Sequence, residues 1–94
     1  MALYLISYDI AEKDAFEYQP LWTRLAQLGA VRILYSEWIT TDDTAKARAV
    51  YSELAPLIQE KDRLLVQEVT KDAYWDKLLI KDDVFNTLVS HARG

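Results

Sequence analysis

The sequence of 94 residues contains no cysteine, which excludes a disulfide framework, a thiolate metal site and a cysteine nucleophile. Its one histidine, His91, lies near the C-terminus, where we expect a surface residue rather than a catalytic base. With only two glycines, there is no glycine-rich loop to hold a phosphate. No apolar run approaches the roughly 18 residues of a membrane span. Met1 leads directly into an apolar strand without the basic start of a signal peptide, so we expect a cytoplasmic protein with no membrane partner.

Basic residues are also scarce. Eleven lysines and arginines face fifteen aspartates and glutamates, and the net charge is -4. Proteins that bind nucleic acid usually carry a basic face, because neutralised phosphates supply most of the affinity. The balance argues against tight, non-specific binding of nucleic acid. It leaves open a local basic patch, or a metal ion that supplies the positive charge.

Apolar residues, in contrast, are plentiful. They make up 51% of the chain, and three tryptophans and six tyrosines are among them. The length is that of a single domain, which we place over residues 1–94. A sheet covered by one layer of helices needs fewer apolar residues than this chain contains. The surplus predicts a second buried surface, most simply against a partner subunit.

The first predicted element is a strand over residues 3–10, rich in β-forming side chains. Both of its faces are largely apolar, so we expect a central strand that is covered on both sides. A helix follows over about residues 14–28, with Asp14 and Glu17 as a capping pair. Pro20 predicts that the regular helix begins near Gln19, because proline is tolerated in a first turn.

The rest of the chain alternates in the same way. We expect Gly29 to end the first helix. The polar run 40–43 is expected to cap a second helix, and Pro56 is expected to bend this second helix or to end it early. The further predicted elements are a strand run at 31–39, a strand at 63–70, a short edge strand at 74–80 and a C-terminal helix at 83–91.

This order of elements predicts an α+β fold of the ferredoxin-like sandwich type, with two helices on one face of an antiparallel sheet. The other face would be open in a monomer, although apolar residues of the first strand must occupy it. A homodimer that stacks sheet against sheet accounts for both observations.

Three short motifs carry a resemblance to a known family. The first strand ends in Tyr8-Asp9-Ile10, the first helix closes in Leu28-Gly29, and the second strand run contains Arg32-Ile-Leu-Tyr-Ser-Glu-Trp38. Over roughly residues 2–70 the chain resembles the small CRISPR-associated Cas-two family, whose architecture the virulence-associated protein D toxins share. The resemblance implies a ferredoxin-like homodimer whose C-terminal segment can add a strand to the partner's sheet.

The resemblance also implies an activity. Asp9 matches the family aspartate that lies near the dimer axis, where two carboxylates are proposed to hold Mg²⁺ or Mn²⁺ for phosphodiester hydrolysis, and Ser36 matches the family serine. From the residues themselves, Asp9 is a suitable ligand for a hard cation or merely a cap of the following loop. Ser36 could bond a phosphate or simply fill the strand. Four aromatic residues are candidates for stacking a base, although aromatic residues in strands more often belong to a core or an interface: Tyr8, Tyr35, Trp38 and Trp75. The candidates for contacting a phosphate are Arg24, Arg32 and Arg63.

One departure from the family pattern keeps other functions open. Family members commonly carry basic residues just after the aspartate, whereas residues 11–17 here are acidic overall. The first hypothesis is a metal-dependent nuclease that acts on RNA or DNA. The second is a non-catalytic dimeric scaffold or module that binds a protein partner. A small-ligand sensor ranks last.

Overall fold

The computed structural model describes residues 2–10, 15–43 and 46–93, and for residues 15–17 only the backbone is considered. The strands are β1 (Ala2–Asp9), β2 (Val31–Leu34), β3 (Glu37–Asp42) and β4 (Arg63–Val69). The helices are α1 (Ala15–Gln27), α2 (Ala47–Leu54), which continues as a 3-10 turn over Ala55–Leu57, and α3 (Asp82–Val89).

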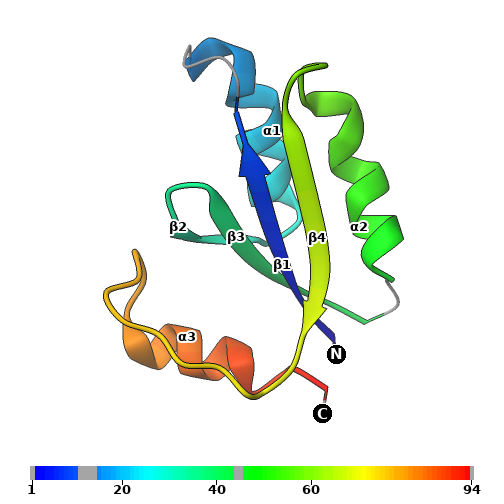
Figure 1. The fold of residues 1–94 in the computed structure, drawn as a ribbon. Helices are drawn as coiled ribbons and strands as arrows, with labels where there is room; N and C mark the ends of the chain where they lie inside the picture. Colours follow the sequence, from blue (N-terminus) through cyan, green and yellow to red (C-terminus); the bar gives the residue numbers. More distant parts are fainter. Residues whose placement is uncertain (1, 11–14, 44–45, 94) are drawn as a thin grey trace.

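The strands form one sheet in the order β2-β3-β1-β4, and all neighbours in it are antiparallel. Helices α1 and α2 lie on one side of this sheet, and α3 lies at the end where both chain termini are found (Figure 1). The predicted α+β class is confirmed, and the strand order is consistent with the ferredoxin-like sandwich. The order also makes β1 a central strand, as its two apolar faces predict.

The larger core lies between the sheet and the helices α1 and α2. The even-numbered residues of β1 point into it, because successive side chains of a strand alternate between the two faces. Its buried members are Ala2, Tyr4, Ile6, Tyr8, Tyr18, Leu21, Leu25, Trp38, Val50 and Leu54.

A second, smaller core covers part of the opposite face of the sheet. Its buried members are Leu3, Ile33, Ile39, Phe85, Val89 and Ala92. The ring of Trp75 meets that of Phe85 edge-on, with 4.6 Å between centroids, and the Leu79 amide donates to the Ile33 carbonyl at 2.9 Å. The C-terminal segment of the same chain thus covers apolar surface that the composition assigned to a partner subunit.

An ion pair holds the end of this C-terminal segment against β4. Two nitrogens of the Arg93 guanidinium donate to the two carboxylate oxygens of Glu68, at 2.7 and 2.8 Å. The hydrogen bond to Glu68 is the main reason why the pKa of Arg93 is raised above its ordinary value, and the charge of Glu68 adds to it.

Two predicted helix starts are wrong. Helix α1 begins at Ala15 and contains Pro20 in its interior, rather than beginning near Gln19. The apolar stripe that α1 buries outweighs the hydrogen bond that proline cannot donate. The predicted cap Asp14 lies outside the described residues, as does the side chain of Glu17. Helix α2 begins after Lys46, which makes no side-chain cap, because Asp42 still belongs to β3.

The helix ends are predicted more accurately. Gly29 has a positive φ of 77°, and it follows α1 with the bonds of a Schellman motif, Gly29 N–H to Ala26 C=O and Ala30 N–H to Leu25 C=O. Helix α2 ends before Pro56, as expected. The predicted edge strand at 74–80 is wrong, because this segment has no regular secondary structure and crosses to the edge of β2.

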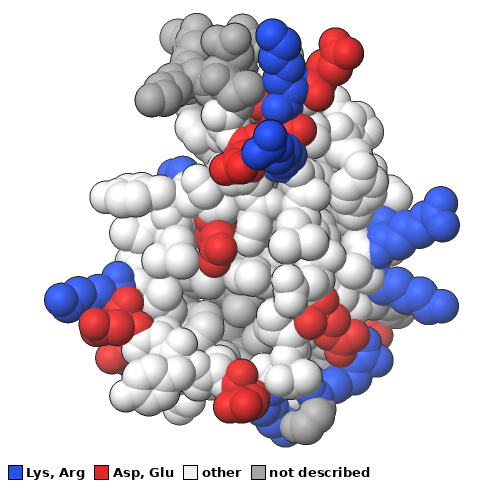
Figure 2. Space-filling model, viewed as in Figure 1, with Lys and Arg blue, Asp and Glu red and all other residues white. Residues whose placement is uncertain are grey.

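Charged residues on the face drawn in Figure 2 are spread rather than gathered. Figure 2 shows mostly uncharged surface on this side, with basic and acidic residues of the described chain distributed around it in small groups. Among the helices of the described ranges, none combines the length and apolar character needed to cross a bilayer.

Candidate functional site

The candidate site lies where β1 ends, between its two neighbouring strands. In the antiparallel register Asp9 is opposite Arg63 of β4, and Ser7 is opposite Glu37 of β3. The Tyr8 amide donates to the Ser36 carbonyl at 3.1 Å, which extends the pairing into the turn between β2 and β3. The two predicted catalytic residues, Asp9 and Ser36, therefore lie at the same end of the sheet.

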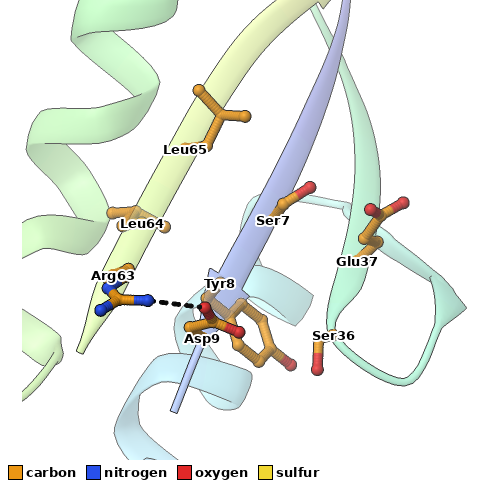
Figure 3. Close-up of a pocket in the computed structure, with 8 residues that line it drawn as sticks. All are labelled: Ser7, Tyr8, Asp9, Ser36, Glu37, Arg63, Leu64 and Leu65. Carbon is orange, nitrogen blue, oxygen red and sulfur yellow. Dashed lines mark hydrogen bonds and ion pairs between the residues drawn. The ribbon is translucent and has the colours of Figure 1, made fainter. Parts of the chain in front are cut away.

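These residues line an open pocket of about 370 Å³. Figure 3 shows the Asp9 side chain between the arginine of β4 and the turn that carries Ser36. The complete lining is Ser7, Tyr8, Asp9, Ser36, Glu37, Arg63, Leu64 and Leu65. The pocket thus combines two carboxylates, two serine hydroxyls and a guanidinium, which are groups that can act on a phosphate and its metal ion.

The Asp9 carboxylate is accessible from solvent. Its side chain is 76% exposed, and its partner Arg63, 3.5 Å away, is 84% exposed. An ion pair that is this long and this exposed contributes little to stability, because water screens it. The carboxylate is therefore free to exchange the guanidinium for another cation.

Metal binding by one copy of the chain would be incomplete. No group of three or more histidine, aspartate or glutamate side chains within the described residues is arranged to hold a metal ion. However, Mg²⁺ is usually bound by one or two carboxylates, and waters and substrate phosphates supply the other ligands. Asp9 and Glu37 both line the pocket, and a metal ion held there stays a prediction.

Tyr8, the predicted stacking residue, lies mostly beneath the pocket. It is only 6% exposed, and its hydroxyl oxygen accepts hydrogen bonds from the indole nitrogens of Trp22 at 3.1 Å and Trp38 at 3.0 Å. The same hydroxyl lies 3.5 Å from the carbonyl of Tyr35. In this arrangement Tyr8 joins β1 to α1, β3 and the β2–β3 turn. A stacking role for it stays a prediction.

Arg32, the predicted phosphate contact, is bound to the same cluster. Its guanidinium carbon lies 5.3 Å from the ring centroid of Trp22 and 5.7 Å from that of Trp38. Its Nε and Nη2 both donate to the Tyr35 carbonyl, the former at 3.0 Å. The guanidinium therefore holds the turn, and a contact with phosphate also stays a prediction.

The sequence did not indicate this cluster of Tyr8, Trp22, Trp38 and Arg32, which we call the turn anchor. The pattern of apolar residues predicts that these aromatic side chains are buried. It does not specify the side-chain positions that let the indole N–H groups of Trp22 and Trp38 donate to one hydroxyl. Ser7 was likewise not predicted as a site residue, whereas Arg63 was a candidate for contacting a phosphate and lies 3.5 Å from Asp9. Only the register of three strands brings them beside Asp9, although Ser7 and Asp9 share one face of β1.

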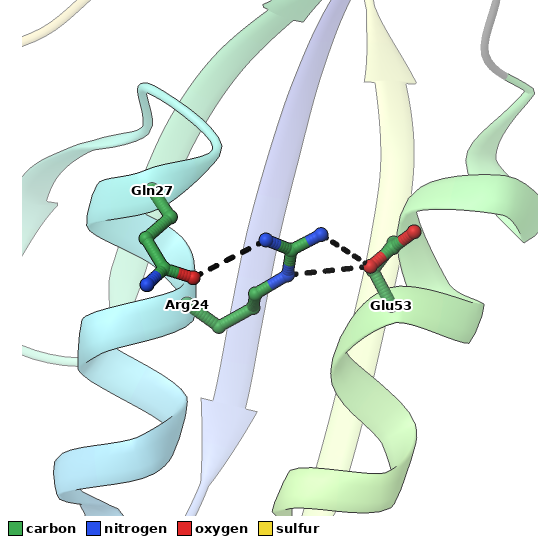
Figure 4. A network of polar contacts seen from close by, with 3 residues as sticks. All are labelled: Arg24, Gln27 and Glu53. Carbon is green, nitrogen blue, oxygen red and sulfur yellow. Dashed lines mark hydrogen bonds and ion pairs between the residues drawn. The ribbon is translucent and has the colours of Figure 1, made fainter.

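A second polar cluster joins the two helices on the other side of the sheet (Figure 4). Arg24 donates through Nε and Nη2 to one carboxylate oxygen of Glu53, at 3.2 and 2.6 Å, and through Nη1 to the side-chain oxygen of Gln27. The guanidinium is thus engaged in linking α1 to α2. It offers no site comparable with the pocket at Asp9.

No protein-family model matches this chain.

Proposed function

We propose that this protein is a divalent-metal-dependent phosphodiesterase of the Cas-two kind, which acts on RNA or DNA as a homodimer. One observation carries the proposal. The exposed carboxylate of Asp9 lies at the end of the central strand, in a pocket that it shares with Ser36 and Glu37.

Each of these residues has a role that suits its chemistry. Asp9 and Glu37 would hold Mg²⁺ or Mn²⁺, and when bound the metal supplies Lewis-acid polarisation of a phosphate oxygen. The Ser36 hydroxyl can donate a hydrogen bond to another phosphate oxygen. Arg63 can turn its guanidinium from Asp9 toward the phosphate, because the pair is long and exposed.

A second copy of the chain would complete the site. The pocket opens on the sheet face at the end away from the C-terminal segment, and Leu65 at its edge is 54% exposed. Two copies stacked there around a two-fold axis would bury both leucines and bring a second Asp9 to the first. A two-fold axis brings the same surface patch of both copies together, so each copy contributes the same residues to the interface.

The proposal is tested by cleavage of single- and double-stranded RNA and DNA in Mg²⁺, in Mn²⁺ and in EDTA. We expect metal-dependent cleavage, and we expect Asp9→Asn to lower the rate about 100-fold or more, because the lost ligand removes several kcal/mol of transition-state stabilisation. Asp72→Asn is the matched control, since Asp72 is an exposed aspartate of the C-terminal segment. Light scattering would show whether both variants remain dimers.

Two results would contradict the proposal. One is the absence of cleavage by the wild-type protein across the whole panel. The other is cleavage by Asp9→Asn at the wild-type rate, which would place the active group elsewhere or in a contaminant.

A second candidate function is a non-catalytic dimeric module that binds a protein partner. It is favoured by the Arg63 guanidinium, which already occupies one side of Asp9, and by the net charge of -4. This function predicts a stable complex with another protein and no cleavage of nucleic acid. It also predicts the absence of salt-sensitive binding to nucleic acid. Binding that falls steeply as salt is raised would exclude it.

A further inference from the structure

A second pocket lies in the C-terminal segment, at the start of α3. Its volume is about 300 Å³, and its lining residues are Ala73, Tyr74, Trp75 and Asp82. None of these four residues lines the pocket where β1 ends. The second pocket is therefore a separate site, which variants can test without touching Asp9.

The two aromatic rings of this pocket are held differently. Tyr74 is 101% exposed, so its ring lies in water. Trp75 is half-buried: it meets the ring of Phe85 edge-on, and its indole Nε1 donates to Oδ1 of Asp82 at 3.2 Å. Because Trp75 is already fixed on the smaller core, a ligand that contacts its outer side does not have to order it, which lowers the entropy cost of binding.

The carboxylate of this pocket has no cation beside it. Asp82 is exposed, and within the described ranges it forms no ion pair. No lysine or arginine of the described chain lines the pocket. A carboxylate has two oxygens and can accept further hydrogen bonds beside the one from the indole. The pocket thus places a free negative charge beside two aromatic rings, and both kinds of group attract a cation.

We propose that this pocket binds an arginine side chain from a basic segment of a partner protein. A guanidinium is planar and weakly hydrated, so it stacks on aromatic rings and also donates strong hydrogen bonds to a carboxylate. The ring of Tyr74 is open to water on all sides, which suits a side chain presented by a larger partner better than an enclosed small ligand. The net charge of -4 attracts such a basic segment.

This inference does not depend on the proposed nuclease activity. It specifies the chemistry of the partner for the second candidate function, and it places the contact on the C-terminal segment. Asp9→Asn should therefore leave the binding of a basic peptide unchanged, whatever that substitution does to cleavage.

The test measures binding of a labelled peptide of alternating arginine and glycine with blocked ends. In nuclear magnetic resonance spectra the indole N–H signal of Trp75 should shift on titration, whereas those of Trp22 and Trp38, which lie in the other core, should not. The same peptide with citrulline, a neutral isostere of arginine, should not bind. The version with lysine should bind more weakly, because an ammonium group is compact and strongly hydrated.

Two pairs of variants locate the contact. Asp82→Asn should weaken peptide binding about 2- to 5-fold, and it should fold, because asparagine keeps an oxygen for the indole. Asp83→Asn is the matched control, since it removes the same charge from the adjacent position of α3. Tyr74→Ala should weaken binding by a similar factor, about 2- to 5-fold. Its control is Tyr51→Ala, which removes a 43% exposed ring from α2.

Four outcomes would overturn the inference. The wild type does not bind the arginine peptide at low salt. The citrulline peptide binds as well as the arginine peptide. Asp82→Asn and Asp83→Asn weaken binding equally, so that the peptide responds to net charge and not to the pocket. Tyr74→Ala binds like the wild type, or it changes the oligomeric state, in which case the ring is a contact between copies. None of these outcomes bears on cleavage at Asp9.

Discussion

Replacing Tyr8 by phenylalanine removes one oxygen atom on which two indole groups depend. The ring of the new residue fills the same space, so the change isolates the hydroxyl. After the substitution the N–H groups of Trp22 and Trp38 have lost their acceptor.

The expected cost follows from how deeply each indole is buried. Trp38 is 9% exposed, so its N–H is left without a partner, which costs about 1–3 kcal/mol. Trp22 is only partly buried and can turn its N–H toward water, so its loss is smaller, about 1 kcal/mol at most. The contact with the Tyr35 carbonyl is 3.5 Å long and adds little. The free energy of unfolding should therefore fall by about 2–3 kcal/mol.

The assay is urea denaturation followed by circular dichroism, with thermal melting as a second measurement. The urea midpoint should fall while the slope stays unchanged, and Tm should fall by roughly 8–24 °C, at about 4–8 °C per kcal/mol for a domain of this size. Tyr74→Phe removes a hydroxyl from a fully exposed ring and serves as the control. In a Trp38→Phe background the same Tyr8→Phe change should cost less, because the buried donor is gone. A loss below about 0.5 kcal/mol for Tyr8→Phe would refute the reasoning, since that is the scatter of surface substitutions.

Two further changes test the C-terminal segment and the end of α1. Phe85→Ala should lower the free energy of unfolding by about 3–5 kcal/mol and speed proteolysis of residues 70–93, because Phe85 fills the smaller core. Val84→Ala, at the exposed neighbouring position, should change little. Equal protease resistance of the two variants would contradict this expectation. Gly29→Ala should lower the free energy of unfolding by about 1–2 kcal/mol, because φ is 77° at this position. The added methyl group would meet no atom within 4 Å, so the cost comes from the backbone conformation and not from a clash. Gly29→Asn should lose less in the same denaturation assay, and a larger loss than for alanine would show that the cost is not conformational.

Local patterns predicted the elements that are long or clearly bounded. The alternation of Leu3 with Tyr4 along β1 predicted a central strand covered on both sides, and the glycine at position 29 predicted the end of α1. Both depend only on neighbours in the chain. Asp9 and Ser36 were each singled out by the family resemblance, and the structure places both in the lining of one pocket, while their catalytic roles stay a prediction.

The remaining features depend on contacts between distant residues. An apolar segment with Tyr74 and Trp75 is compatible with an edge strand, but packing of Phe85 against the sheet draws it into an irregular path. The length of β3 could not be predicted either, because Asp42 is a good cap by type but continues the strand opposite Ala2. Tertiary pairing outweighs local preference in both cases.

The division of apolar residues between the two faces of the sheet gives each face its own fluorescent reporter. Trp22 and Trp38 belong to the core under α1 and α2, and Trp75 belongs to the core under α3. A variant that keeps only Trp75 would follow detachment of the C-terminal segment, and one that keeps only Trp38 would follow loss of the main core. If the two emission signals change at different urea concentrations, the segment unfolds as a separate unit, and the sheet face that it covers becomes available before the rest of the protein unfolds.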